Sequence, residues 1–162
     1  MRYIQLFENY DSFFDKKKYK GTIIYRGMDK AEYEKVLIGE DMGYFFSEDK
    51  NFAGDYGNYV ISAVLNTNNV FNSLDNRNIL KIYNEGLKLY DEYSDTTFNT
   101  PDEYFNSDLN QMGSDTWDII ESSHGVLDWI MGIYDACYIT EGGVANYYIN
   151  DPFTYLKILK KV

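Results

Sequence analysis

The chain has 162 residues, enough for one sizeable hydrophobic core, and its hydrophobic fraction of 44% excludes a disordered chain. Its formal net charge of −11 argues against binding nucleic acid through the phosphates. No apolar run approaches the ~20 residues of a membrane span, the N-terminus lacks a signal-peptide core, and the single Cys137 cannot form an internal disulfide. We therefore expect residues 1–162 to form one cytoplasmic domain that binds neither membranes nor nucleic acid directly.

The acidic residues gather in the second half of the chain. Residues 89–156 contain 13 Asp or Glu and no Lys or Arg, whereas residues 1–88 contain 12 basic and 13 acidic residues. This distribution supports two interpretations, which the sequence leaves open. An acidic surface can steer a protein toward a basic partner, or it can simply keep the protein soluble.

Short strands and helices alternate in the first half of the chain. Residues 2–20 are mixed in pattern, and a short strand and a helix are expected there. Glycines and capping residues then mark the element ends. The pattern predicts a strand over 21–26, a helix over 29–38 capped by Asp29, a short aromatic strand over 43–47 and a short helix over 49–56.

The second half is predicted to be more helical before it ends in a hairpin. Its expected elements are strands over 59–65 and 70–72, a helix over 76–92, a loop over 94–113 with one helical turn after Pro101, and a helix from Ser114 with Trp117, Ile120, Leu127 and Ile130 on one face. A strand over 134–141, a turn at Gly142-Gly143, a strand over 144–149 and a last segment over 155–159 follow. The predicted fold class is α+β.

Three of these strands end in side chains suited to chemistry. Arg26 ends the first strand, and Gly27 after it lets a ligand approach the backbone, so the pair suits a phosphorylated ligand. Ser47 ends the aromatic strand and offers a hydroxyl. Glu141 lies at the tip of the late hairpin and offers a carboxylate. The single His and single Cys exclude a His/Cys zinc site, and no metal is expected.

The order of these motifs resembles that of the ADP-ribosyltransferase family, in its arginine-serine-glutamate class. Tyr25-Arg26-Gly27 matches the aromatic-Arg-Gly motif, Phe46-Ser47 matches the start of the second motif, and Glu141 matches the late glutamate. The resemblance covers residues 21–72 and 114–160 and extends to small phage-encoded members, including anti-CRISPR enzymes. It implies a split pair of small antiparallel sheets flanked by helices, with an acidic insertion at about 73–113.

The family resemblance also implies roles for individual residues around bound NAD+, the co-substrate. Glu141, Arg26 and Ser47 would be catalytic, and Arg26 would also pair with NAD+ phosphate or ribose oxygens. Gly27, Ser47 and Tyr56 would contact the nicotinamide end, Tyr56 by stacking on the ring. Phe45, which falls on the motif tyrosine of the polymerase branch but has no hydroxyl, and Phe46 beside it would also contact NAD+.

The sequence departs from the family pattern at two places. Glu48 and Asp49 replace the usual further hydroxyl residues of the second motif, and Ile139 stands where many members have Glu or Gln. The target rules of those members therefore do not transfer to this chain.

The function implied by the resemblance is mono-ADP-ribosyl transfer to a host protein, by a phage or mobile-element effector such as an anti-CRISPR. The acidic half suggests that the target has a basic surface. Two alternatives remain: a non-enzymatic acidic inhibitor or DNA mimic on the same fold, and an NAD+ glycohydrolase with water as acceptor.

Overall fold

The computed structural model describes residues 18–161, so the elements expected before residue 18 lie outside it. Its first elements in chain order are β1 (Ile23–Met28), α2 (Lys30–Leu37), β2 (Phe45–Ser47), α3 (Lys50–Gly54), β3 (Tyr59–Leu65) and β4 (Val70–Asn72). Next come α4 (Asn76–Asn84), β5 (Leu89–Asp91), β6 (Thr96–Phe98), α5 (Pro101–Phe105) and α6 (Asp108–Met112). The last are α7 (Thr116–Ser122), α8 (Val126–Ile133), β7 (Ala136–Glu141), β8 (Val144–Ile149), α9 (Pro152–Tyr155) and β9 (Leu156–Lys161).

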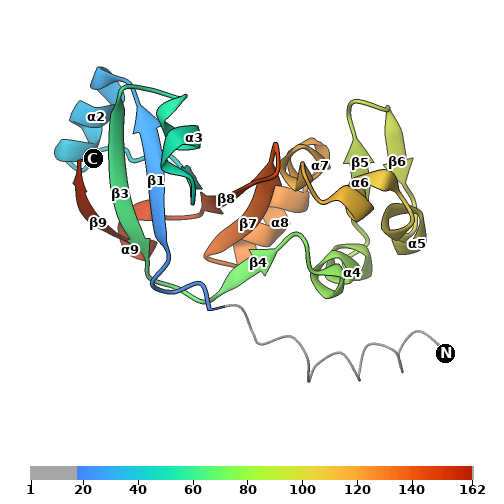
Figure 1. The fold of residues 1–162 in the computed structure, drawn as a ribbon. Helices are drawn as coiled ribbons and strands as arrows, with labels where there is room; N and C mark the ends of the chain where they lie inside the picture. The colour runs from blue at the N-terminus through green and yellow to red at the C-terminus, as the bar shows by residue number, and fades with distance from the viewer. Residues whose placement is uncertain (1–17, 162) are drawn as a thin grey trace.

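The fold is α+β and is organised around a seven-stranded sheet with the order β4-β7-β8-β2-β1-β3-β9. The expectation of two separate antiparallel sheets is wrong in this form, because β1 and β2 join the strands into one sheet and β4 runs parallel to β7. The connection between its halves is narrow, however: β1 and β2 are joined through one register pair, Tyr25 with Ser47. Figure 1 shows β9, β3 and β1 on one side and β8, β7 and β4 on the other.

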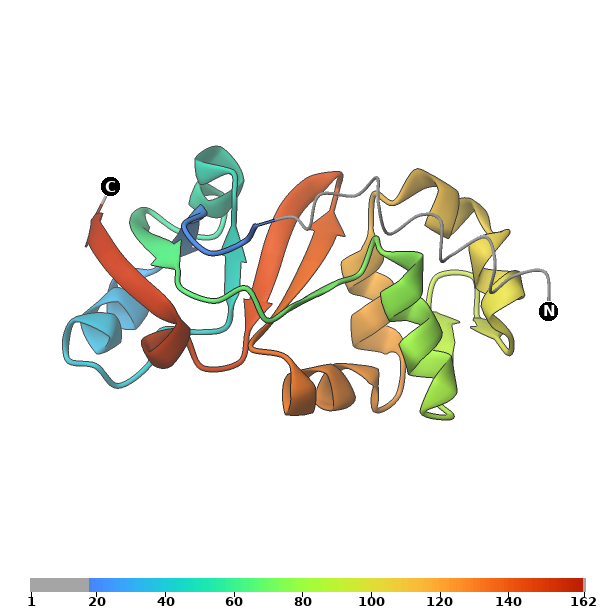
Figure 2. The ribbon, with the colours of Figure 1, turned by 90° about the horizontal axis from the view of Figure 1, so that it is seen from below.

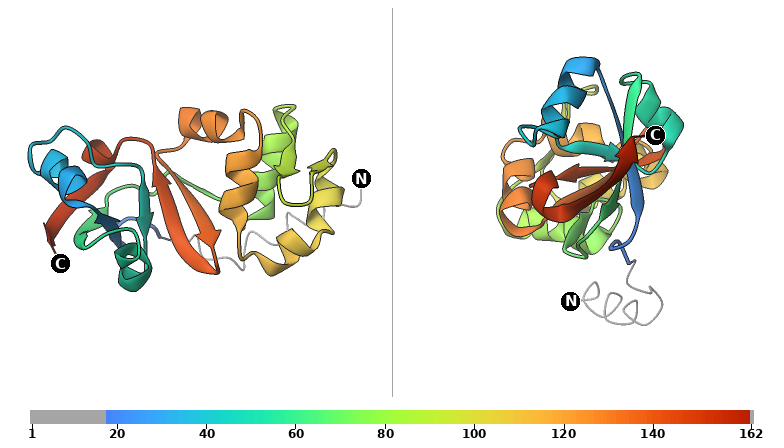
Figure 3. Two further views of the ribbon diagram at one scale, coloured as in Figure 1. Left: turned by 90° about the horizontal axis from the view of Figure 1, so that it is seen from above. Right: turned by 90° about the vertical axis from the view of Figure 1, so that its left-hand side faces the viewer.

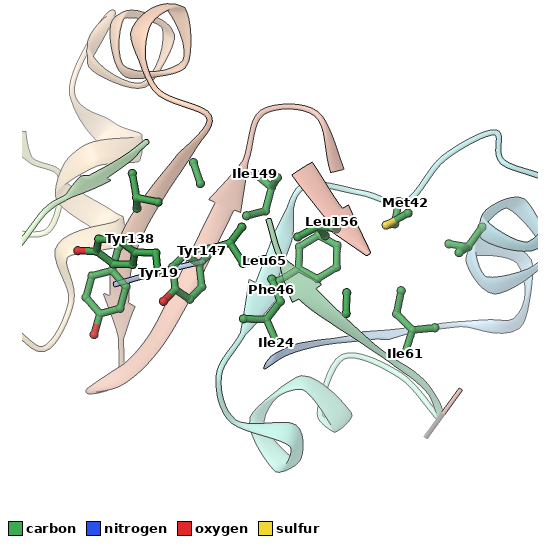
Figure 4. Close-up of a cluster of buried hydrophobic side chains, with 14 of the residues drawn as sticks. Tyr19, Ile24, Met42, Phe46, Ile61, Leu65, Tyr138, Tyr147, Ile149 and Leu156 are labelled. Carbon is green, nitrogen blue, oxygen red and sulfur yellow. The ribbon is translucent and has the colours of Figure 1, made fainter. Parts of the chain in front are cut away.

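Side chains alternate between the two faces of the sheet along each strand, and they form one hydrophobic core on each face. The first core contains Ile24, Phe46, Tyr138 and Tyr147, which point together in Figure 4. The second core lies under α4, α7 and α8, and includes Ile139 with neighbours from these helices.

The segment over 73–113 is more structured than its sequence predicts. The expected helix over 76–92 ends at Asn84, because the chain turns at Gly86 with a positive φ of 77°. A hairpin of β5 and β6 follows, forming a separate two-stranded sheet, and the predicted loop contains α5 and α6. These elements gather beside α7 and α8 at the end of the molecule away from β9 (Figure 2). Whether this segment is an insertion stays a prediction.

The helix predicted from Ser114 is in fact two helices. The chain leaves the helical conformation at Ser123, and Gly125 begins α8 with a positive φ of 75°. The Ser123 hydroxyl, at the break between the two helices, accepts a hydrogen bond from the Tyr90 N–H at 2.8 Å. This bond connects the helices to β5.

The predicted caps of the helices that follow the first two site residues are confirmed, but β1 continues through Gly27 to Met28 and does not end at Arg26 as expected. Asp29 caps α2, where its side chain accepts from the Glu32 N–H and the Glu32 carboxylate accepts from the Asp29 N–H. Asp49 caps α3 in the same way through the N–H groups of Asn51 and Phe52. The two views in Figure 3 show α2 and α3 beside β1 and β3.

Candidate active site

A cavity of about 300 Å³ opens beside β1 and the ends of β2 and β7, between α3 and α7. Its lining includes Arg26 and Gly27 from β1, Phe45 and Ser47 from β2, and Glu141 from the end of β7. Tyr56, which follows α3, completes the set of predicted residues at the cavity. The structure thus brings together residues from far-apart parts of the sequence around one space.

Arg26 crosses the narrow connection between β1 and β2. Its Nη1 donates to the Phe45 carbonyl at 3.1 Å, and its Nη2 lies 3.4 Å from the Glu32 carboxylate. Its guanidinium passes directly over Gly43, which has a positive φ of 63°. A Cβ at that position would lie 2.4 Å from the Arg26 Cζ, so a larger residue would force the guanidinium to move.

Gly27 allows α3 to approach β1 closely. A Cβ on Gly27 would lie 1.8 Å from the Ala53 carbonyl oxygen, so a larger residue would displace α3. The same approach places Tyr56 at the cavity, where its side chain is 56% exposed. Its hydroxyl donates to the Glu141 carboxylate over a long 3.5 Å, and its ring lies 5.6 Å from that of Phe52. A partly exposed ring of this kind is available for stacking on a ligand.

Glu141 is held at the hairpin tip by the backbone around it. The Gly142 N–H donates to Asp115 at 2.7 Å, and the Thr140 N–H donates to the Thr116 hydroxyl at 2.9 Å. Thr116 is also bonded to Ser73, with 2.6 Å between the two hydroxyl oxygens. These bonds fix the end of β7 to the start of α7.

Burial raises the pKa of Glu141 above its ordinary value, and the negative charges of Asp118, Asp115 and Glu121 raise it further. The hydrogen bond from Tyr56 acts in the opposite direction. A carboxylate with a raised pKa in a cavity is a frequent property of functional sites. Among residues 18–161, Arg26 is the one cationic side chain in the cavity lining, which also includes the carboxylates of Glu32 and Glu141.

The side chains of Phe45, Phe46 and Ser47 alternate between the two faces of the sheet along β2. Ser47 is 2% exposed, lines the cavity, and its hydroxyl oxygen accepts from the Asp49 N–H at 3.0 Å. Phe45 points to the same face and meets Trp117 edge to face at 5.5 Å. Phe46 points to the opposite face, is 1% exposed in the first core, and does not line the cavity. Strand alternation explains this outcome for Phe46, which was expected beside the ligand.

Several cavity residues were not identified as site residues from the sequence, Trp117 and Glu32 among them. Trp117 lines the cavity and stacks on Tyr148 at 5.6 Å, but its helical spacing pointed only to a core position. Glu32 lines it from α2, and its place three residues after the Asp29 cap signalled only a capping role. Its proximity to Arg26 gives it a second role, which helical spacing alone does not reveal.

Comparisons with known proteins add no relative. A scan against protein-family models, a search of curated proteins and a search of solved structures each find no match to this chain. Within residues 18–161, no group of three or more His, Cys, Asp or Glu side chains is arranged to hold a metal ion, and no helix is long and apolar enough to cross a membrane. The functional argument therefore rests on the cavity itself.

Proposed function

We propose that the protein is a mono-ADP-ribosyltransferase with an ADP-ribosyltransferase-like fold that uses NAD+ as co-substrate. The observation that carries this proposal is the meeting of Arg26, Ser47 and Glu141 on one cavity, beside the exposed ring of Tyr56. Each of these residue types suits one part of the dinucleotide. Their convergence is also the geometric condition that the motif order in the sequence requires.

The size of the cavity suits one end of NAD+ better than the whole molecule. A volume of about 300 Å³ lies at the lower end of the range for small-molecule sites, roughly 300–1,000 Å³. We assign the nicotinamide and its ribose to the cavity, with the ring on Tyr56 and the amide against the Gly27 backbone. Arg26 then pairs with phosphate oxygens, for which Glu32 must release the guanidinium or share it.

Glu141 is assigned the main role in the reaction. When the bond between nicotinamide and ribose breaks, nicotinamide leaves with the electron pair and positive charge builds on the ribose. A fixed carboxylate that bonds a ribose hydroxyl and faces this charge stabilises the transition state more than the ground state. The acceptor then attacks the ribose carbon and loses its proton. Ser47, which also lines the cavity, supports the ribose directly or acts on Glu141 through a neighbouring side chain.

The partner proposed for this reaction is a host protein with a basic surface, in the cytoplasm of the host cell. The acidic residues over 89–156 include Asp115, Asp118 and Glu121, which lie close enough to Glu141 to raise its pKa. A phage or mobile-element effector that inactivates a host defence protein, such as an anti-CRISPR, would fit this combination of features.

The proposal is tested with NAD+ and host lysate. We expect the protein to release nicotinamide and add ADP-ribose to a host protein, as detected by mass spectrometry. Glu141→Gln should lower the turnover by about 10²-fold or more with a much smaller change in NAD+ affinity. Glu85→Gln is the matched control, since Glu85 is exposed at the end of α4 and outside the cavity. Full activity in Glu141→Gln would refute the assignment.

The charge distribution favours a second candidate, a non-enzymatic acidic inhibitor. The absence of Lys and Arg over 89–156 would let this surface occupy a basic groove, and such a protein needs neither Arg26 nor Glu141. No nicotinamide release, combined with target inhibition that survives Glu141→Gln, would favour the inhibitor. Release of free ADP-ribose without any labelled protein would favour an NAD+ glycohydrolase.

A further inference from the structure

A buried polar side chain in the middle of β8 has no structural explanation. Asn146 is 0% exposed, and neither its Nδ2 nor its Oδ1 has a hydrogen-bond partner among residues 18–161. An amide removed from water without partners destabilises a fold, and an apolar residue of similar volume would avoid that cost. A function for this carboxamide is therefore the more economical explanation.

The sheet register places Asn146 between two of the proposed active-site residues. Ser47 of β2 lies directly opposite Asn146 on one side, and Ile139 of β7 lies opposite it on the other. Directly opposed residues share a face, so the side chains of Asn146 and Ser47 point to the same side of the sheet. Glu141 pairs with Val144, which makes Glu141 the diagonal neighbour of Asn146 on that face, at about 7–8 Å.

The intervening strand separates Ser47 from Glu141. Neighbouring strands lie about 4.8 Å apart, so β8 puts roughly 10 Å between the backbones of β2 and β7. Ser47 is therefore poorly placed to orient Glu141 by itself. Ile139 and Val144, which also neighbour Asn146 on this face, are apolar, and Tyr148, two residues along β8, stacks its ring on Trp117. Ser47 and Glu141 are thus the polar side chains next to Asn146 on the two flanking strands.

The donor and acceptor groups of these three side chains are complementary. The Ser47 oxygen already accepts from the Asp49 N–H, which leaves the hydroxyl proton to be donated. A carboxamide oxygen can accept a hydrogen bond from such a hydroxyl, while the carboxamide NH₂ group can donate a hydrogen bond to a carboxylate. Glu141 is bonded to Tyr56 over a long 3.5 Å, so its carboxylate is loosely held on that side.

We propose that Asn146 is a positioning residue that couples Ser47 to Glu141 when the cavity is occupied. Its carbonyl oxygen accepts a hydrogen bond from the Ser47 hydroxyl, and its NH₂ group donates a hydrogen bond to the Glu141 carboxylate. Tyr56 is then released to stack on the ligand. This inference rests on the proposed function, since it assigns a reason for the placement of the carboxylate that faces the ribose. It also explains why a residue that weakens the fold stands in a buried strand.

Asn146→Leu tests the inference, because leucine has the same branching at Cγ without a polar group. We expect Tm to stay unchanged or rise, kcat for nicotinamide release to fall by about tenfold or more, and KM for NAD+ to stay within about twofold. The acid limb of the pH–kcat profile should move to higher pH, because a donor to the Glu141 carboxylate is lost. Asn146→Ala, which removes the same group without adding volume, supplies the kinetic comparison if the leucine variant does not fold.

Ile139→Val is the matched control. It trims the buried neighbour of Asn146 on β7 without changing any polar group, so it should lower Tm slightly and leave kcat and its pH profile unchanged. Wild-type kcat in Asn146→Leu, or a Tm that falls further than in Ile139→Val, would overturn the inference. A wild-type protein without NAD+ turnover would instead overturn the proposed function, and the Tm comparison would then decide alone whether Asn146 is structural.

Discussion

Gly43→Ala should displace Arg26 in the cavity, although Gly43 is not itself a lining residue. Gly43 lies in the turn before β2 with a φ of 63°, and the Arg26 guanidinium passes over it. The Cβ of alanine would lie 2.4 Å from both Cζ and Nη2 of Arg26, far inside any real contact distance. The guanidinium must therefore move, and its 3.1 Å hydrogen bond to the Phe45 carbonyl must lengthen or break.

The magnitude follows from two separable terms. A left-handed backbone conformation costs an alanine about 1 kcal/mol, independent of neighbours. A hydrogen bond from a charged group is worth roughly 1.5–3 kcal/mol, and the Arg26 side chain is only 19% exposed, so most of this term should remain. We expect a total loss of about 2–4 kcal/mol in the free energy of unfolding. Misplacing Arg26 should also raise KM for NAD+ by about tenfold or more.

Gly39→Ala isolates the first term. Gly39 has a similar φ of 73°, but a Cβ there would meet no heavy atom within 4 Å. Urea unfolding should give a loss of about 1 kcal/mol for Gly39→Ala, and nicotinamide release should give an unchanged KM. Equal stability losses and equal KM values in the two variants would refute the argument that Gly43 exists to accommodate Arg26.

Two further predictions concern the end of β7. Because burial and Asp118 raise the folded-state pKa of Glu141, the charged form disfavours folding, and stability from this group declines as pH rises through that pKa. The Tm of Glu141→Gln should therefore rise relative to that of the wild type as the pH increases above about 4, and a constant difference would contradict this. Thr116→Val should cost about 1–3 kcal/mol in urea unfolding because it leaves the buried Thr140 N–H without an acceptor, whereas Thr97→Val on exposed β6 should cost far less.

Local chemistry was sufficient to predict the elements that carry the site. Asp29 and Asp49 begin helices because their side chains accept from the first free N–H groups, and this depends on adjacent residues only. The hairpin turn at Gly142-Gly143 was predicted for the same reason, whereas β1 continues through Gly27 to Met28 and does not end at Arg26 as expected. Such signals need no knowledge of the rest of the fold.

Signals that depend on distant residues were misread. Ile82, Leu87 and Tyr90 have helical spacing, but Leu89 is buried in the second core and the Tyr90 N–H bonds Ser123, so the chain forms a strand instead. Phe46 was expected at the ligand because all residues of its motif were assigned to one face of the sheet. Side chains alternate along the strand, so Phe46 lies on the opposite face, in the first core. The motif order thus predicted which strands meet, and strand alternation explains why Phe46 alone among the predicted site residues does not line the cavity.

The site lies where the sheet is most weakly joined. Beyond the single pair of Tyr25 with Ser47, β1 and β2 diverge, and the Arg26 side chain replaces backbone pairing by bonding the Phe45 carbonyl. One half of the sheet therefore supplies the guanidinium, while the other supplies Glu141 through β7. A ligand that contacts both groups must bridge the two halves. An elongated ligand with an anionic middle and a reactive end meets this requirement, which is a physical reason for preferring a dinucleotide to a compact substrate.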